Sequence, residues 1–339
     1  MAGKVRVLRS NLNSIYANLA IEEAIIARNS TEPHLFLWRN EPAVTIGRHQ
    51  NPWKECNLGV MDDHGVNLAR RYSGGGAVYQ DLGCTTFTFV NALSVDMVAS
   101  RIIDSNFETL VDSLKNLGLN AQRKGRNDVQ VGDCKVSGSA FKQVPGCLVH
   151  HGTILVDTDM TRLGQYLTPS KLKLQSKGIS SVSARVVNLT QVNPQITHEH
   201  ICESLTNTYR SHYNTIVDSS DPFIVDSSIQ TDPNFRHHFS VLKDWNWRYG
   251  TTPEFSHHLE TRIDQIGCFD IHYQVNHGKI YKVVIFSDCL YPDLIQQIQT
   301  KLTDTEYDPI VIRKTLLSTH SEDEILKSFT NWFVTEITP

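Results

Sequence analysis

Hydrophobic and polar positions follow two patterns along this chain, helical periods and short apolar runs. Apolar side chains recur every three or four residues along 13 to 28, after the N-cap candidates Asn13 and Ser14. They do so again along 101 to 117, where Gly118 follows, and both segments predict helices. Runs bounded by turn residues predict strands at 35 to 38, 43 to 46, 66 to 71, 77 to 80 and 84 to 90. The dipeptide Asn51-Pro52 predicts a short helix start.

Two hairpins are predicted in the middle of the chain. Gly132-Asp133 indicates a tight turn between strands 129 to 131 and 134 to 136, which places Lys135 on the second strand. Pro145-Gly146 indicates a second turn, between strands 139 to 144 and 147 to 156. Helices are predicted after it, near 159 to 166 and at 198 to 211 with Thr197 as the cap.

The C-terminal third changes character. Residues 218 to 234 are polar and rich in Ser, Asp and Pro, which predicts a surface excursion. A packed connector is expected at 244 to 253. Strands near 260 to 274 and 279 to 287 follow, then a helix from Pro292 and a last helix from the capping box at Ser321. We therefore predict two domains, residues 1 to 247 and residues 248 to 339.

Composition narrows the class of protein. A length of 339 residues favours two domains, and a net charge of −4 gives no basic field for nucleic acid. The seven cysteines include no CxxC, which is typical of reduced thiols. No apolar run is long enough for a membrane span, and the N-terminus lacks a secretory apolar region. We expect a cytoplasmic protein, with the mitochondrial matrix as the alternative for a processed form.

Three glycines follow two arginines in the segment from Arg70 to Tyr79. Glycine lets backbone N–H groups approach an anion, and the fork of arginine suits phosphate. A sharp strand turn beside a solvated arginine pair is the plain alternative. The segment is no Walker A loop, because no Gly-Lys-Ser/Thr follows, and no Rossmann start, because strands come next.

A second segment places Asn127 and Asp128 shortly before Lys135, which lies among small residues. A solvated lysine and ordinary turn chemistry would each explain one of these residues. Their convergence on one short hairpin favours a pocket that binds a phosphate-bearing ligand and keeps a cation at the reacting centre. The loop from 171 to 182 carries three lysines and is either solvated or a lid over an anionic ligand.

The histidines and cysteines predict no metal site and no separate catalytic centre. His150 and His151 are adjacent on a predicted strand, so they face opposite sides and cannot both bind one metal. His198 and His200 stand at a predicted helix start, with their imidazoles about 200° apart around the helix. The pairs His237-His238 and His257-His258 lack companions at ligand spacing. We therefore predict no metal held permanently by the protein. Cys84 and Cys134 allow a thioester nucleophile, but small buried cysteines are the more typical reading.

The chain resembles the lipoate–protein ligase A family over its entire length, and the bacterial ligases more than the animal mitochondrial lipoyltransferases. The stretches that carry the resemblance are 37 to 40, 47 to 55, 70 to 79, 125 to 128, 135 to 140, 150 to 153, 177 to 182 and 245 to 255. The resemblance implies an α+β fold. Its large catalytic domain has mixed sheets with flanking helices, as in biotin protein ligases, and a small C-terminal α+β domain follows.

The resemblance also implies an activity in two half-reactions. Lipoate and ATP, with Mg²⁺, give lipoyl-AMP and pyrophosphate, and the lipoyl group then passes to a lysine amine. The implied acceptors are apo lipoyl domains of 2-oxoacid dehydrogenase E2 subunits and the glycine cleavage H protein. We expect a monomer that uses neither nucleic acid nor a membrane.

Site residues follow from the same resemblance, with Lys135 as the catalytic residue and Asp128 as a candidate Mg²⁺ contact. The implied ATP and adenylate contacts are Arg71, Gly76, Ala77, Val78, Tyr79, Asn127, Asp128, Lys135, Lys177, Gly178 and Val182. The implied lipoate contacts are Leu19, Trp38, Arg71, Ser73, Gly74, Gly75, Val78, Lys135 and His151. Leu19, Trp38 and Val78 would line an apolar tunnel, although ordinary core packing explains each of them equally well.

Four positions depart from the family pattern. Gln80 and Cys84 replace a histidine and an asparagine, while Cys134 and Ser183 stand where arginines are usual. Two fewer cations near phosphate would weaken ATP use and leave acyl transfer intact. The alternative function is therefore a lipoyl or octanoyl transferase that takes a preformed acyl-AMP or acyl carrier. A non-catalytic ligand sensor is a third class, disfavoured because no helix-turn-helix is found and Lys135 is retained.

Overall fold

A computed structural model describes residues 5–28, 31–50, 52–94, 97–168, 186–213, 223–249, 257–276, 279–318 and 323–337. Its largest element is an eight-stranded mixed sheet. The strands run in the order β11 (Phe223–Val225), β1 (Arg6–Ser10), β2 (His34–Trp38), β6 (Cys84–Ala92), β10 (Cys147–Leu155), β9 (Cys134–Val144), β8 (Asp128–Val131) and β7 (Ala121–Lys124). Beside it lies a small sheet of β4 (Asn67–Arg70), β3 (Ala43–Ile46) and β5 (Val78–Gln80).

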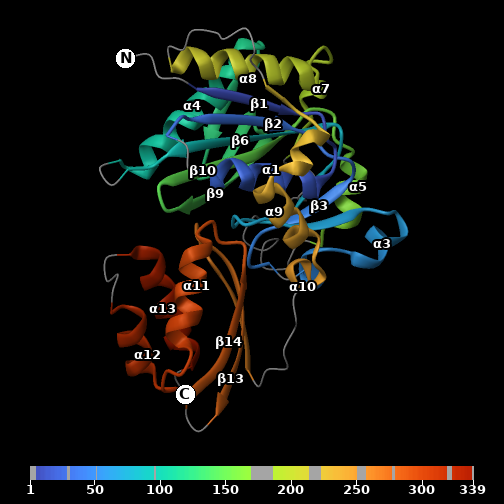
Figure 1. The fold of residues 1–339 in the computed structure, drawn as a ribbon. Coiled ribbons are helices and arrows are strands. Elements are labelled where there is room, and N and C mark those ends of the chain that lie inside the picture. Colours follow the sequence, from blue (N-terminus) through green and yellow to red (C-terminus); the bar gives the residue numbers. More distant parts are fainter. Residues whose placement is uncertain are drawn as a thin grey trace.

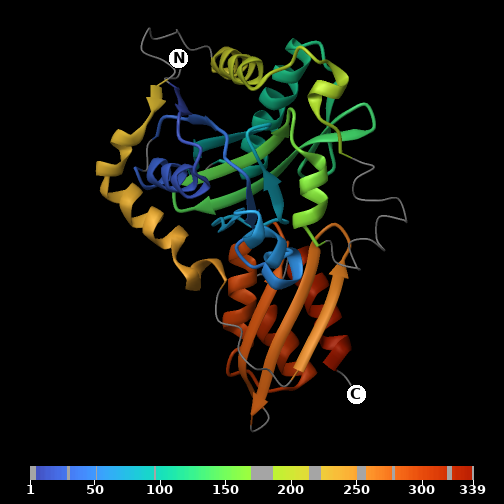
Figure 2. The ribbon, with the colours of Figure 1, turned by 90° about the vertical axis from the view of Figure 1, so that its right-hand side faces the viewer.

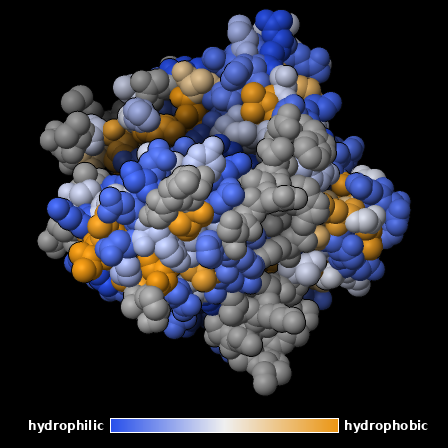
Figure 3. All heavy atoms as spheres, turned by 90° about the horizontal axis from the view of Figure 1, so that it is seen from below, coloured by the Kyte–Doolittle hydropathy of each residue, from blue (hydrophilic) through white to orange (hydrophobic). Residues whose placement is uncertain are grey.

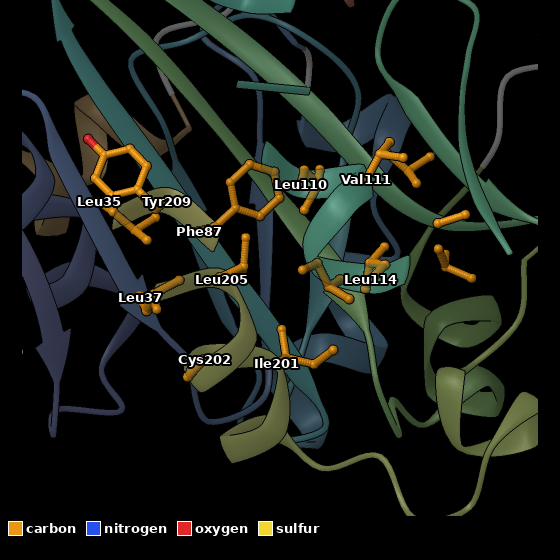
Figure 4. Close-up of a cluster of buried hydrophobic side chains, with 14 of the residues drawn as sticks. Leu35, Leu37, Phe87, Leu110, Val111, Leu114, Ile201, Cys202, Leu205 and Tyr209 are labelled. Atoms are coloured by element: carbon orange, nitrogen blue, oxygen red, sulfur yellow. The ribbon is translucent and has the colours of Figure 1, made fainter. Parts of the chain in front are cut away.

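Two long helices cover one face of the large sheet, α4 (Ala99–Asn116) and α8 (His198–His212). Their apolar faces pack against alternate residues of β2 and β6, as Figure 4 shows. The side chains that meet there are Leu35, Leu37, Phe87, Leu110, Val111, Leu114, Ile201, Cys202, Leu205 and Tyr209. Gly118 ends the first of these helices with a φ of 78°, a conformation that favours glycine.

The other face of the sheet carries α1 (Ile15–Ala27), which α9 (Pro233–Lys243) covers in turn (Figure 1). Every residue of α1 from Ile15 to Ile26 is buried, because the helix lies between the sheet and α9. Ser14 caps it by accepting a hydrogen bond from the Ala17 amide. The remaining short elements of this unit are α2 (Pro52–Glu55), α3 (Leu58–Asp63), α5 (Met160–Tyr166), α7 (Leu189–Val192), η2 (Ser227–Thr231) and α10 (Trp245–Arg248).

The C-terminal unit has a core of its own. Its antiparallel sheet comprises β12 (His257–Ile263), β13 (Gly267–Asn276) and β14 (Lys279–Ser287). The helices α11 (Pro292–Leu302), α12 (Pro309–Leu316) and α13 (Glu324–Ile337) pack on one face of that sheet, behind the strands in Figure 2. The predicted boundary after residue 247 falls within α10, and its position stays a prediction.

In the part of the chain that the structure covers, every helix is too short or too polar to span a bilayer. Seen from below, the molecule presents a mostly hydrophilic face on which hydrophobic side chains form separate groups (Figure 3).

Most predicted elements are confirmed, and four need correction. The predicted surface excursion, 218 to 234, holds β11, which pairs with β1 at the sheet edge, and the start of α9; its residues 218–222 lie outside the described residues. The strands predicted on either side of Gly138 form one strand, β9. The segment near 260 to 274 is broken into β12 and β13 by a turn, and α12 was not predicted. Finally, Asp323 caps α13 through the amides of Ile325 and Leu326, two residues after the predicted cap at Ser321.

Replacing Phe329 by alanine should lower the free energy of unfolding of the C-terminal unit. Its ring is fully buried against Phe269 and Phe333, and such truncations typically cost about 3–5 kcal/mol. Urea unfolding followed by tryptophan fluorescence measures the loss, since Trp332 contacts the ring. Ile310→Ala in α12, where the side chain is 78% exposed, is the control and should leave the curve unchanged. An equal loss in both variants would contradict this account of the core.

Candidate functional site

The face of the large sheet beneath α1 brings the predicted ligand residues into rows. Strand register sets the first row across four strands: Trp38, Thr86, Thr153 and Gly138. The second row lies beside it: Phe36, Thr88, His151 and Ala140. Three threonines and a histidine give this face a polar strip in an otherwise apolar layer, which is unusual for a surface that a helix covers.

A buried relay of polar groups joins α1 to this strip. Glu22 of α1 binds His151 Nδ1 at 2.9 Å and accepts a hydrogen bond from Thr88 Oγ1 at 2.6 Å. The other ring nitrogen of His151, Nε2, lies 2.6 Å from Ser73 Oγ at the start of the glycine run. The three groups Glu22, His151 and Ser73 are all at least 94% buried, so the relay is shielded from water. It ties the glycine run to the sheet and to α1.

Two neighbouring carboxyl groups of α1 titrate in opposite directions. Burial alone would raise the pKa of Glu22, but the charge of His151 and hydrogen bonds from His151 and Thr88 outweigh it, so the pKa is lowered. The pKa of Glu23 is raised, because burial outweighs the attraction of Lys142, whose Nζ lies 2.6 Å from it. One buried carboxylate is therefore held ionised while its neighbour resists ionisation.

The guanidinium of Arg71 organises the glycine run from within. It is buried and donates hydrogen bonds to the carbonyl oxygens of Thr45, Gly74 and Gly76 and to Ser73 Oγ. Gly75 adopts a φ of 92°, and a Cβ there would meet Arg71 Nη2 at 2.9 Å. Only glycine fits at this position. The glycine run thus folds around the side chain of Arg71, which precedes it in the chain.

Arg70 does not face the glycine run. Its guanidinium donates to the carbonyl oxygens of Gly47, Arg48 and Gln50 and to those of Trp247 and Arg248. The indole of Trp247 donates back to the Arg70 carbonyl at 2.9 Å. Backbone carbonyls therefore take up the donors of Arg70, as they do for Arg71, and both side chains are buried, so the alternative of a solvated arginine pair is wrong.

Lys135 reaches the same face from the hairpin of β8 and β9. Its Nζ lies 2.6 Å from Asp128 Oδ1, and both side chains are about one-third exposed, at 33% and 31%. A Cβ on Gly138 would meet Lys135 Nζ at 3.0 Å, so the ammonium lies directly over the backbone of the first row. The Asn127 side-chain amide donates to the Ser139 carbonyl, and the Ser139 amide donates to the Asn127 carbonyl. These two hydrogen bonds fix Asn127 beside Lys135. The predicted hairpin with Gly132 at its turn is confirmed.

The C-terminal unit lies on the glycine run. The Gly75 amide donates to the Cys289 carbonyl, and a Cβ on Gly74 would meet that carbonyl oxygen at 2.2 Å. The backbones of His49 and Ser287 also pair, and His49 Nε2 lies 3.1 Å from the Pro292 carbonyl. The glycine run therefore has the large sheet on one side and the C-terminal unit on the other.

The remaining predicted residues are placed as follows. Leu19 and Trp38 lie together in the core beneath α1, and within the described residues the Trp38 indole N–H has no hydrogen-bond partner. Gly76 and Val78 are half-buried, Ala77 packs with the small sheet and Tyr79 is buried. Lys177, Gly178, Val182 and Ser183 lie outside the described residues.

Two departures from the family pattern have structural roles. Gln80 is buried and accepts hydrogen bonds from Asn40 and Thr45. Cys84 is buried, and burial raises the pKa of its thiol, so it stays protonated and is a poor nucleophile. The interpretation as a small buried cysteine is thus confirmed for Cys84, whereas Cys134 is only half-buried. His150, on the opposite face from His151 as predicted, sits in a cage of phenylalanines, where burial lowers its pKa.

Sequence reasoning missed Glu22 and Thr88 as parts of this site. The helical pattern put Glu22 on the same face of its helix as Ile15, Leu19 and Ile26. A carboxylate on an apolar face was the available signal, because a buried charge needs a buried partner.

A cavity of about 380 Å³ lies elsewhere, near the N-terminal strand and α8. Its walls include Arg9, Arg39, His198 and Cys202, none of which belongs to the predicted site. Burial lowers the pKa of His198 to about 4 and raises that of Cys202 to about 12. Neither group therefore offers a charged acid or a thiolate at neutral pH, and the cavity is not the candidate site.

Comparison with protein families gives two matches that together cover most of the chain. Residues 14–210 match the lipoyl protein ligase A/B catalytic domain. Residues 252–335 match the bacterial lipoate protein ligase C-terminus. A lipoate-protein ligase A of Psychrobacter cryohalolentis is 44% identical over 90% of this chain and 89% of that protein. One of Bdellovibrio bacteriovorus is 40% identical over 93% of this chain and 92% of that protein.

Solved structures agree with these matches. The P. falciparum protein LipL1 in complex with lipoate superposes with a TM-score of 0.86 at 34% identity, covering 98% of this chain and all of that one. A lipoate-protein ligase A bound with ATP gives a TM-score of 0.62 at 27% identity over 74% of this chain and 99% of that one. An archaeal bi-partite ligase with its E2 lipoyl domain gives 0.64 at 27% identity over 75% of this chain and 100% of that one. The predicted α+β class with a small C-terminal unit is confirmed.

Substitution of Glu22 and Glu23 by glutamine should change the pH dependence of stability in opposite senses. The lowered pKa of Glu22 contributes stability above 4.5, the ordinary value, that is lost as the pH falls through the folded-state pKa. The raised pKa of Glu23 contributes stability at low pH that is lost as the pH rises. The excess of unfolding free energy at neutral pH over that at acidic pH should shrink in Glu22→Gln and grow in Glu23→Gln. Urea titrations at both pH values measure it, and shifts of the same sign would refute the assignment.

Proposed function

This chain belongs to the lipoate–protein ligase A family, and we propose that it activates lipoate with ATP to lipoyl-AMP and passes the lipoyl group to a lysine of a lipoyl domain. The observation that carries the proposal is the Lys135 ammonium, which lies over Gly138 at the end of the row that begins with Trp38. The row has the apolar Trp38 at its buried end and a partly exposed cation at the other. This arrangement suits a ligand with an apolar body and an anionic head.

The chemistry assigns Lys135 the role of the fixed cation. A carboxylate becomes a good acyl donor only as a mixed anhydride, and its attack on an α-phosphate gathers negative charge. An ammonium held there stabilises that charge as it develops. The pair with Asp128 positions Lys135 Nζ without burying it, since both side chains stay about one-third exposed. Lys135 would then also polarise the acyl carbonyl when the acceptor amine attacks.

The lipoyl chain would lie on the strip between α1 and the sheet. Leu19 and Trp38 supply apolar wall at its inner end, and the unpartnered Trp38 indole N–H is a donor that a buried ligand would meet. The relay through His151 and Ser73 holds the glycine run against that wall. Val78, half-buried at the start of β5, stays a further predicted contact of the lipoyl chain.

The glycine run would contact the adenylate. The carbonyls of Gly74 and Gly76 are bound to Arg71, so the loop has a fixed course that an adenylate can meet. Asn127 and Asp128, at the start of the hairpin, complete this side of the site. Lys177, Gly178 and Val182, outside the described residues, stay predicted adenylate contacts.

Mg²⁺ would arrive with ATP. Asp128 offers one partly exposed carboxylate, and Mg²⁺ is usually held by one or two carboxylates together with substrate phosphates and water. The residues thus fit a metal that the nucleotide carries. When bound it would neutralise phosphate charge, while Asp128 orients Lys135.

The finer points of the proposal are its acceptors, assembly and location. We propose E2 lipoyl domains and the glycine cleavage H protein as acceptors, a monomeric state and a cytoplasmic location. Support for a lipoyl-domain acceptor comes from the solved archaeal ligase with its E2 lipoyl domain.

Mass spectrometry of an apo lipoyl domain tests the function directly. Incubation of the full chain with the domain, free lipoate, Mg²⁺ and ATP should add one lipoyl group, and omission of ATP should prevent it. Lipoate-dependent exchange between ATP and pyrophosphate should accompany the modification. Modification only from preformed lipoyl-AMP, without exchange, would replace the ligase by the transferase alternative. No modification from either donor would refute both.

Lys135→Ala should reduce lipoate-dependent pyrophosphate exchange by about 100- to 1,000-fold, as loss of one charge-stabilising donor typically does. Lys115→Ala is the control, because Lys115 is exposed on α4, which covers the opposite face of the sheet. That variant should keep its exchange rate. Circular dichroism checks that both variants fold, and normal exchange by a folded Lys135→Ala would remove the residue from the mechanism.

A further inference from the structure

We propose that the C-terminal unit binds a divalent transition-metal ion, with Zn²⁺ as the reference ion, between His258, Asp270 and His272. These residues lie on β12 and β13, outside the site described above. Their ligand atoms all lie within 4.8 Å of one another.

Strand register brings the three residues together. His258 of β12 directly faces His272 of β13, and Asp270 precedes His272 by two residues, which puts it on the same face. The intervening Ile271 points to the opposite face, into the core beneath the helices. In Figure 2 the strands stand in front of those helices, so the face with the three residues is turned to the viewer.

This geometry corrects the expectation that His257-His258 has no ligand-spaced companion. Spacing along the chain was the wrong measure, because twelve and fourteen residues separate His258 from Asp270 and His272 in sequence but only one strand pairing separates them in space. The prediction of no protein-held metal rested on that spacing.

The donor atoms converge on one point. His258 Nε2 and His272 Nε2 lie 2.7 Å and 2.8 Å from the same oxygen, Asp270 Oδ1. The two rings are parallel, with centroids 4.4 Å apart and planes 9° from each other. The edge of Phe286 against His272 helps to set the orientation of that ring. Two imidazoles thus present corresponding nitrogens to one carboxylate.

Charge favours a metal in this place. If both rings were protonated, two like charges would stack 4.4 Å apart beside a single carboxylate. A divalent ion bound by two neutral imidazoles and one carboxylate avoids that repulsion. Two imidazoles and one carboxylate are a donor set of zinc and other first-row transition metals, whereas Mg²⁺ and Ca²⁺ prefer oxygen alone.

The surroundings allow a metal ion to enter and the donor atoms to move slightly apart. Zinc holds such ligands at about 2.0–2.2 Å, so the donor atoms need to separate by roughly half an ångström. The Asp270 side chain is 11% exposed and that of His272 19%, while that of His258 is 47% exposed. The buried carboxylate forms the floor and the His258 side is open. Three protein ligands leave a fourth position for water.

Metal titration of the full-length chain tests the site. After chelator treatment and dialysis, calorimetry with Zn²⁺ should show one saturable equivalent, and Zn²⁺ should raise the unfolding temperature because it binds only the folded state. Co²⁺ should give the visible absorption of a nitrogen- and oxygen-bound ion. Cobalt–thiolate absorption would place the ion at a cysteine and overturn the proposal.

Variants distinguish the site from adventitious binding. His258→Ala and His272→Ala should each weaken Zn²⁺ binding by at least about 100-fold, since even losses around the ligands cost about 10- to 100-fold. His257→Ala is the control, because its exposed ring stacks on Tyr273 instead. It should bind Zn²⁺ as the parent does.

The unfolding temperature measured without metal shows whether a variant is still folded. His258→Gln is a milder replacement at the exposed position, and its metal-free unfolding temperature should match that of the parent. Retained stoichiometric binding in His258→Gln and His272→Ala would overturn the proposal. So would an absence of saturable Zn²⁺ binding by the parent chain, which would leave the three residues as an ion-paired cluster.

Discussion

The buried guanidinium of Arg71 is the interaction on which the candidate site depends. A glycine-rich segment has no side chains to hold its course, and its carbonyl groups need partners once water is excluded. Arg71 supplies those partners from inside the loop, bonding Thr45, Gly74 and Gly76. A charged group can remain buried there because each of its three nitrogens donates a hydrogen bond and the ionised Glu22 lies within electrostatic reach.

The same principle extends from the loop into the sheet. Glu22, His151 and Ser73 link three segments that are remote in sequence, namely α1, β10 and the glycine run. Each polar group in the relay is satisfied by the next, so the site is fixed by hydrogen bonds where a purely apolar core would be free to repack. The ligand-facing strip can then remain polar along one side and apolar at Trp38.

Sequence reasoning succeeded where the determining interactions are local. The periodicity of α4 and α8, the turn at Gly132 and the place of Lys135 on a strand depend on neighbours a few residues away. It failed where strand register or contacts between distant segments determine the structure. The short strand β11 pairs with the edge that β1 offers, and its apolar run of three residues within a polar segment is too short to predict that pairing. Arg70 could not be told from Arg71, since only the fold reveals which carbonyls each one meets.

The joint between the two units is built largely from main-chain atoms. The amide of Gly75 meets the carbonyl of Cys289, and the backbones of His49 and Ser287 pair. Peptide groups are common to every amino acid, so these backbone contacts do not themselves use the side chains at 287 and 289. The side-chain requirement lies on the glycine run, because the contact at Gly74 leaves no room for even a methyl group. Attachment of the C-terminal unit thus depends on the single hydrogen atom that Gly74 has in place of a side chain.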